Sequence, residues 1–145
     1  MSTMTSPTSA PGSRRDGLLN ALVGIAAIIV VGLPIQAFLA SYGLFEGESG
    51  FISVHRVFGM VLVLLIAIQV VMYALLVQRG VAGRGAFVGS IVVLLVYLAQ
   101  MMLGFATRDD AGMAAWHIPL GVLLMGGSVM GLLRAQGMRN GNGAA

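Results

Sequence analysis

The sequence predicts an all-α fold: a polytopic membrane four-helix bundle built from two duplicated helical hairpins. Three observations support this fold class. Of the 145 residues, 58% are hydrophobic and only 9% are charged, against about 25% charged in soluble domains. The apolar residues fall into four long stretches, and the two halves of the chain repeat a short polar pattern.

The four apolar stretches cover residues 17–40, 51–77, 86–105 and 113–133. Each is close to the roughly 20 helical residues that cross a bilayer. Helices are expected because lipid offers no partner to open backbone groups, and no stretch alternates like a barrel strand. We therefore predict one transmembrane domain over residues 17–134.

The two ends of the chain are more polar. Residues 1–16 begin with a run rich in Ser, Thr and Pro and are predicted to be a disordered cytoplasmic tail. Residues 135–145 are predicted to be a second cytoplasmic tail. Arg14 and Arg15 before an apolar run resemble a twin-arginine export signal, but the bulky Phe38 near the end of that run disfavours cleavage.

The arginines predict the orientation, because cytoplasmic loops are enriched in them. Six fall on one side of the four spans and two on the other. The larger group is Arg14, Arg15, Arg79, Arg84, Arg134 and Arg139, and the smaller is Arg56 and Arg108. The chain is therefore predicted to be a multi-pass plasma-membrane protein with both termini in the cytoplasm.

Composition excludes several function classes. The sequence pI is about 10.2, but the arginines are too scattered for the basic face that binds nucleic acid. Cysteine is absent, which excludes disulfides, thiolate metal sites and iron–sulfur clusters. No carboxylate lies within a span, which argues against a proton path or a small multidrug exporter.

A weak repeat relates the two predicted hairpins. Each hairpin carries a glutamine in its first span, then a histidine and a glycine one helical turn apart near the start of its second span. The matched pairs are Gln36 with Gln100, His55 with His117, and Gly59 with Gly121. A pseudo-two-fold axis along the membrane normal would place both histidines at similar depth.

The histidine pair is the candidate metal site. Histidine within a membrane span tends to face the bundle interior and to mark a site. Two facing imidazoles at one depth suit the two axial positions of a haem iron. We therefore predict that His55 and His117 ligate one haem b near the outer face, although single interfacial histidines often only anchor helix ends.

Neighbouring residues are predicted to support this cofactor. Gly59 and Gly121 would remove side chains that collide with the porphyrin. Gln36 and Gln100 would hydrogen-bond the imidazoles or the propionates, or else serve as interhelical partners without a cofactor.

Arg56 and Arg108 would pair with the propionates, although snorkelling anchors are the commoner role of such arginines. Zinc is the competing metal, but it usually takes at least three protein ligands. The remaining zinc ligands would have to come from loop carboxylates that fold back toward the histidines: Glu46, Glu48, Asp109 or Asp110.

With His55, Arg56 and Gly59 on the second span and His117 on the fourth, the chain resembles one half of haem A synthase. The resemblance covers residues 17–134 and implies a four-helix bundle in which the histidine pair holds a haem. The family carries a functional glutamate three residues before the second-span histidine, where this chain has Ile52. The resemblance therefore implies haem binding more than haem A synthesis.

Two nitrogen ligands fill both axial positions of a haem, so electron transfer with a membrane redox partner is the predicted function. The competing hypothesis is a structural or assembly subunit without a cofactor. A spectrum of the purified protein separates these hypotheses.

The arginine distribution yields a testable orientation. A reporter fused after Ala145 is expected to be active only in the cytoplasm, because six arginines flank that side. Activity of the same fusion outside the cytoplasm would reverse the topology and place both histidines at the inner face.

Overall fold

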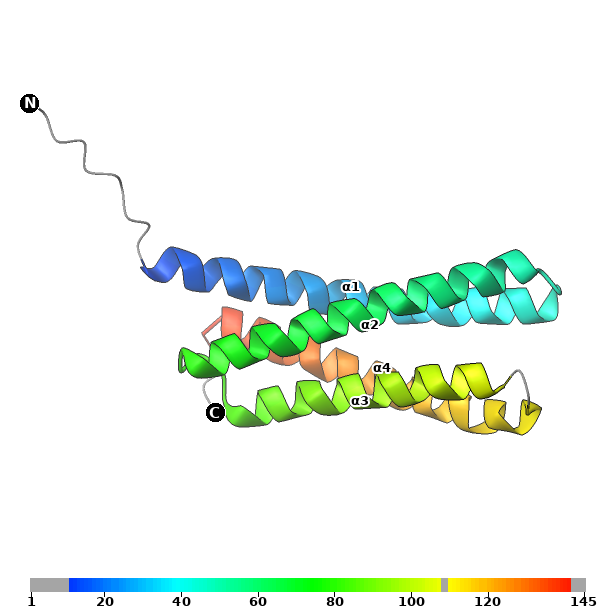
Figure 1. The fold of residues 1–145 in the computed structure, drawn as a ribbon. Helices are drawn as coiled ribbons and strands as arrows, with labels where there is room; N and C mark the ends of the chain where they lie inside the picture. Colours follow the sequence, from blue (N-terminus) through cyan, green and yellow to red (C-terminus); the bar gives the residue numbers. More distant parts are fainter. Residues whose placement is uncertain (1–10, 108–109, 142–145) are drawn as a thin grey trace, which may run out of the picture.

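The computed structural model of the chain describes residues 11–107 and 110–141 (Figure 1). These residues form four long helices and one short 3-10 helix, without a strand among them. In chain order the elements are α1 (Pro11–Phe45), α2 (Ser49–Gln78), α3 (Arg84–Ala106), η1 (Ala111–Met113) and α4 (Ala114–Arg139). Each of the four α-helices is long and apolar enough to cross a bilayer, as expected of a multi-pass membrane protein.

Two predicted boundaries differ from the structure. Helix α1 begins at Pro11, so residues 11–16 are helical although the sequence placed them in a tail. Proline suits a first helical turn because its φ is already helical and no donor is lost there. Helix α4 continues to Arg139, beyond the predicted domain end at residue 134, because a helix can outlast its apolar stretch. The rest of the predicted N-terminal tail and residues 142–145 lie outside the described residues.

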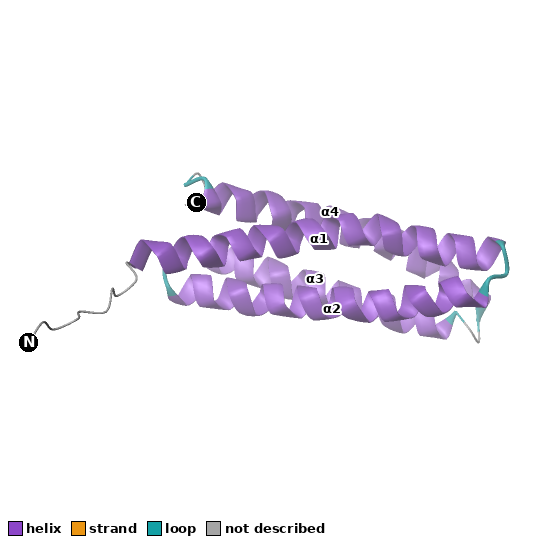
Figure 2. Cartoon of the chain, turned by 90° about the horizontal axis from the view of Figure 1, so that it is seen from above, coloured by secondary structure: helices purple, strands orange, loops and turns teal. Residues whose placement is uncertain are grey.

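The four helices form an antiparallel bundle in which each packs against two neighbours. Helix α1 lies against α2 and α4, and α3 lies against the same two helices. The pairs α1/α3 and α2/α4 are therefore diagonal (Figure 2). The start of α1 and the end of α4 lie at one end of the bundle, called here the terminal end (Figure 1). The α1–α2 and α3–α4 connections lie at the other end, called here the loop end.

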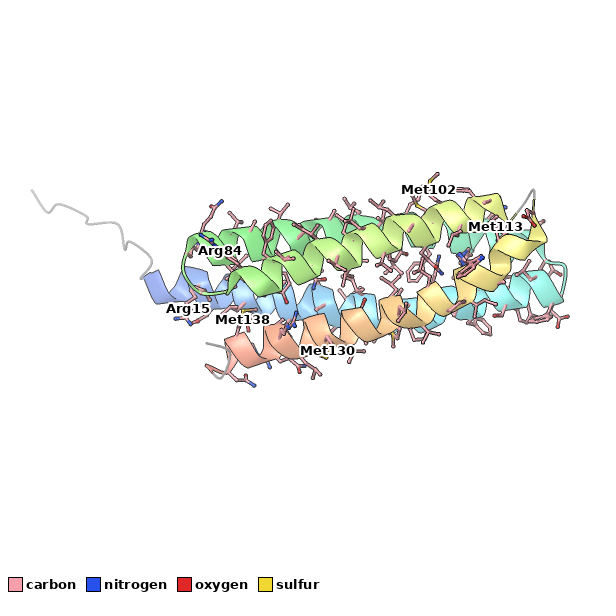
Figure 3. All side chains as sticks on the ribbon, turned by 90° about the horizontal axis from the view of Figure 1, so that it is seen from below. Arg15, Arg84, Met102, Met113, Met130 and Met138 are labelled. Atoms are coloured by element: carbon pink, nitrogen blue, oxygen red, sulfur yellow. The ribbon has the colours of Figure 1, made fainter. Side chains whose placement is uncertain are left out.

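Figure 3 helps to orient the bundle, with Arg15, Arg84 and Met138 near the terminal end and Met102 and Met113 near the loop end. The arginines assigned to one side by the sequence, as far as they are described, thus share one end of the bundle. Which membrane side that end faces stays a prediction.

The packed core is confined to the terminal end and the middle. One buried cluster lies toward the terminal end and includes Leu22, Tyr73 and Leu76. A second lies near the middle and consists of Ile29, Leu62, Ile66, Tyr97 and Leu124. At the loop end, across residues 33–58 and 98–121 as far as their burial is described, Gly43 alone is buried. The loop end therefore lacks a core of packed apolar side chains.

Glycines allow α1 and α2 to approach closely. A Cβ on Gly32 would lie 2.7 Å from Leu62 Cδ2, and a Cβ on Gly43 would lie 2.8 Å from Ile52 Cδ1. The Gly43 position would also be 3.0 Å from the Ile52 backbone nitrogen, which cannot move aside as a side chain can. Small residues give membrane helices this close backbone contact.

This contact gives a stability prediction. Gly43→Ala is expected to destabilise the bundle by about 1–3 kcal/mol, because the added methyl overpacks the α1–α2 contact. A folding assay in detergent micelles would measure the change. Gly24→Ala is the matched control in the same helix, since its Cβ would meet nothing within 4 Å and the helix gains about 0.5–1 kcal/mol. Equal stability of the two variants would contradict the close α1–α2 contact.

Candidate functional site

His55 is held against α1 by two hydrogen bonds at the loop end. It lies in the second turn of α2, half-buried, with Nδ1 2.9 Å from the backbone oxygen of Gln36. The Gln36 side chain returns a bond, since its Nε2 donates to the His55 backbone oxygen at 2.8 Å. One glutamine thus binds both the ring and the backbone of the histidine.

His117 repeats the arrangement in the other helix pair. It lies in the first turn of α4, and its Nδ1 is 3.0 Å from the backbone oxygen of Gln100 in α3. The ring packs over Gly104, where a Cβ would lie 3.1 Å from its Cε1 atom. Both matched histidines therefore bind the backbone oxygen of the matched glutamine through Nδ1.

These contacts fix the protonation of each neutral ring. A backbone carbonyl can only accept a hydrogen bond, so Nδ1 must carry the proton in both histidines. Nε2 then keeps its lone pair. A histidine that donates Nδ1–H to a carbonyl and offers Nε2 is in the form that ligates metals, with the ring orientation fixed by the donated bond.

The two glycines face the glutamine side chains. A Cβ on Gly59 would lie 2.7 Å from Gln36 Nε2, and a Cβ on Gly121 would lie 3.1 Å from Gln100 Nε2. From the sequence, both glycines were expected to leave space for a porphyrin. In the structure the glycines make room for the glutamine amides, which explains why each follows its histidine by one helical turn.

The two glutamines contact the histidines mainly through their backbones. The backbone oxygens of Gln36 and Gln100 bind the imidazoles, and the Gln36 side chain makes an interhelical bond, the alternative role expected for it. The side-chain oxygens Gln36 Oε1 and Gln100 Oε1 are buried and have no hydrogen-bond partner. An unsatisfied buried carbonyl is costly, so two matched ones mark polar positions where a further donor would be stabilising.

Tyr97 is part of the site and was not identified from the sequence. Its side chain is 4% exposed, and its hydroxyl donates to the Gly59 backbone oxygen at 3.1 Å. This bond ties α3 to α2 one turn from His55. A hydroxyl within an apolar helix, three residues before Gln100, was the available signal.

The sequence predicted two further site residues, Arg56 and Arg108. Arg56 is exposed, and Arg108 lies outside the described residues. The structure therefore brings together six of the eight predicted site residues in two matched sets.

The two imidazoles belong to the diagonal helices α2 and α4. In the described part of the chain, no three His, Cys, Asp or Glu side chains form a group that could hold a metal ion. His55 and His117 could instead supply two nitrogen ligands to a metal that brings its remaining ligands with it.

Comparison with family models, with curated proteins and with solved structures gave no match for the chain.

The hydrogen bonds to the rings yield a spectroscopic prediction. In protein without a bound metal, ¹⁵N NMR at a pH where both rings are neutral is expected to show protonated Nδ1 and unprotonated Nε2 in both histidines, because each Nδ1 faces a carbonyl. His55→Ala and His117→Ala assign the two sets of signals. Protonated Nε2 in either neutral ring would contradict the contact with the glutamine backbone.

Proposed function

We propose that the chain is an integral membrane b-type haem protein in which His55 and His117 are the axial ligands. The observation that carries this proposal is the matched Nδ1 contact with a glutamine carbonyl in both helix pairs. It leaves Nε2 free as a donor atom on each of two diagonal helices. Bis-histidine ligation needs two such nitrogens.

The packing of the loop end supports a planar cofactor there. Within residues 33–58 and 98–121, none of the apolar side chains whose burial is described is buried. The middle of the bundle, by contrast, is well packed. A large apolar group between the helices would supply the missing contacts. The histidine rings lie on the same level as this region, since both are near the first turns of their helices.

Electron transfer is the function that suits such a site. A haem held by two imidazoles supplies one-electron oxidation and reduction at its iron and has no open axial position for a substrate. The chain would bind and orient it through fixed rings, and would transfer electrons to or from a redox partner in the membrane. The site would face the outer side if the terminal end is cytoplasmic, as the arginines predict.

The position of Ile52 favours an electron carrier over an oxidase. In haem A synthase, which the chain resembles, a functional glutamate stands at this place. Here Ile52 packs against Gly43 of α1, and an apolar side chain there supplies no acid–base group. The matched histidine–glutamine contacts in the two helix pairs are also what a duplicated hairpin would produce. We propose that the chain arose from such a duplication.

Removing either ligand tests the function. His55→Ala and His117→Ala are each expected to abolish low-spin haem, because one remaining nitrogen leaves the iron five-coordinate. The measurement is haem content and absorption spectrum of protein purified after expression with an ample haem supply. Val54→Ala and Trp116→Ala are matched controls, since these exposed side chains are sequence neighbours of the ligands.

The controls are expected to keep the haem content of the unchanged protein. Low-spin haem retained in both histidine variants would refute ligation by these residues. An unchanged chain without haem would favour the structural or assembly subunit.

A further inference from the structure

A second polar region lies in the terminal half of the bundle, away from the histidines. It is a cavity of about 30 Å³ between α2, α3 and α4. Its lining includes Gln69, Tyr73, Gly89, Ser128, Gly131 and Arg134. The apolar cluster around Leu62 and Leu124 lies between this cavity and the histidine site, so the two polar regions are separate.

One residue that lines the cavity, Ser128, has a buried hydroxyl that has no partner and does not reach the cavity surface. Ser128 is 6% exposed, and its Oγ makes no hydrogen bond. Gln69 is also buried, at 8% exposed. The Tyr73 hydroxyl already donates to the Gly131 backbone oxygen at 3.1 Å. An unpaired polar group inside a membrane span is costly, so a χ1 change that turns the Ser128 hydroxyl into the cavity would be favoured once an acceptor is there.

Arg134 supplies a positive charge at the edge of this cavity. Its Nη1 would lie 3.0 Å from a Cβ on Gly89, so the guanidinium reaches from α4 across to α3. The side chain is exposed, and no carboxylate lines the cavity. The residue stands roughly 7.5 Å inside the end of α4 at Arg139, from a rise of about 1.5 Å per residue. Arg134 also directly follows the apolar stretch of residues 113–133, so we expect its guanidinium near the headgroup layer at the terminal end.

We propose that this cavity is a binding site for the phosphate of an anionic phospholipid. Arg134 would donate to the phosphate oxygens, for which a guanidinium has suitable fork geometry. One oxygen would enter the cavity, and the Ser128 hydroxyl would turn toward it and donate. Basic pockets between membrane helices bind acidic headgroups in this manner.

The size and charge of the site select the ligand. A volume near 30 Å³ holds about two water-sized atoms, so it admits phosphate oxygens while the rest of the headgroup stays at the mouth. A zwitterionic lipid would bring a cationic amine, and no carboxylate in the lining can receive it. Net negative headgroups are therefore preferred.

Native mass spectrometry of the full chain tests the proposal. The protein would be released from nanodiscs that contain equal amounts of phosphatidylglycerol and phosphatidylcholine. The unchanged chain is expected to retain phosphatidylglycerol selectively. Arg134→Gln is expected to lower this retention about tenfold, as for the loss of a charge-assisted hydrogen bond. Arg139→Gln removes the same charge from the same helix outside the cavity and is expected to change it little.

Two further arms distinguish the possible outcomes. Ser128→Ala is expected to lower retention several-fold without changing the folded fraction, because it removes a donor and leaves only a methyl group. Inorganic phosphate added in excess is expected to leave retention unchanged, whereas displacement by it would point to a free-phosphate site and overturn the lipid assignment. Equal losses in Arg134→Gln and Arg139→Gln would show a diffuse charge effect and also refute the proposal.

Discussion

The hydrogen bond from imidazole Nδ1–H to a glutamine carbonyl is the interaction on which the proposed site depends. It occurs twice, at 2.9 Å for His55 and 3.0 Å for His117. Each bond joins the second helix of a hairpin to the first, so the same contact packs the helices and orients the ring. Because a carbonyl cannot donate, it also decides which nitrogen keeps its lone pair.

Absence of water in the bilayer explains why these contacts take this form. A polar side chain in a span must find its partner within the bundle. Gln36 does so through the His55 backbone, and Gly59 provides the room for its amide. The side-chain oxygens of Gln36 and Gln100 remain unpaired. The loop end thus combines oriented rings and unsatisfied acceptors with little apolar packing, whereas the middle of the bundle is closed by residues such as Leu62 and Leu124.

Much of the fold followed from hydropathy alone, because four stretches of near-membrane length leave a helical bundle as the available solution. Hydropathy did not predict the exact helix ends. Helix α1 starts at Pro11 and α4 ends at Arg139, because helix propensity continues past the apolar residues.

The pairing of the histidines with the glutamines followed from their matched positions in the chain. Sequence spacing could not show that the backbone of Gln36 and Gln100 binds the rings, because backbone oxygens are present at every residue. Nor could it identify Tyr97, whose hydroxyl bonds Gly59 of another helix, since such a contact depends on the relative rotation of α2 and α3.

The central claim is that two oriented imidazoles hold a haem between diagonal helices. The most direct test is the haem-to-protein ratio of the unchanged chain, measured together with electron paramagnetic resonance of its oxidised form. The account predicts one haem per chain and a low-spin ferric signal typical of two nitrogen ligands. Protein purified without haem, or with haem in a high-spin state, would contradict it.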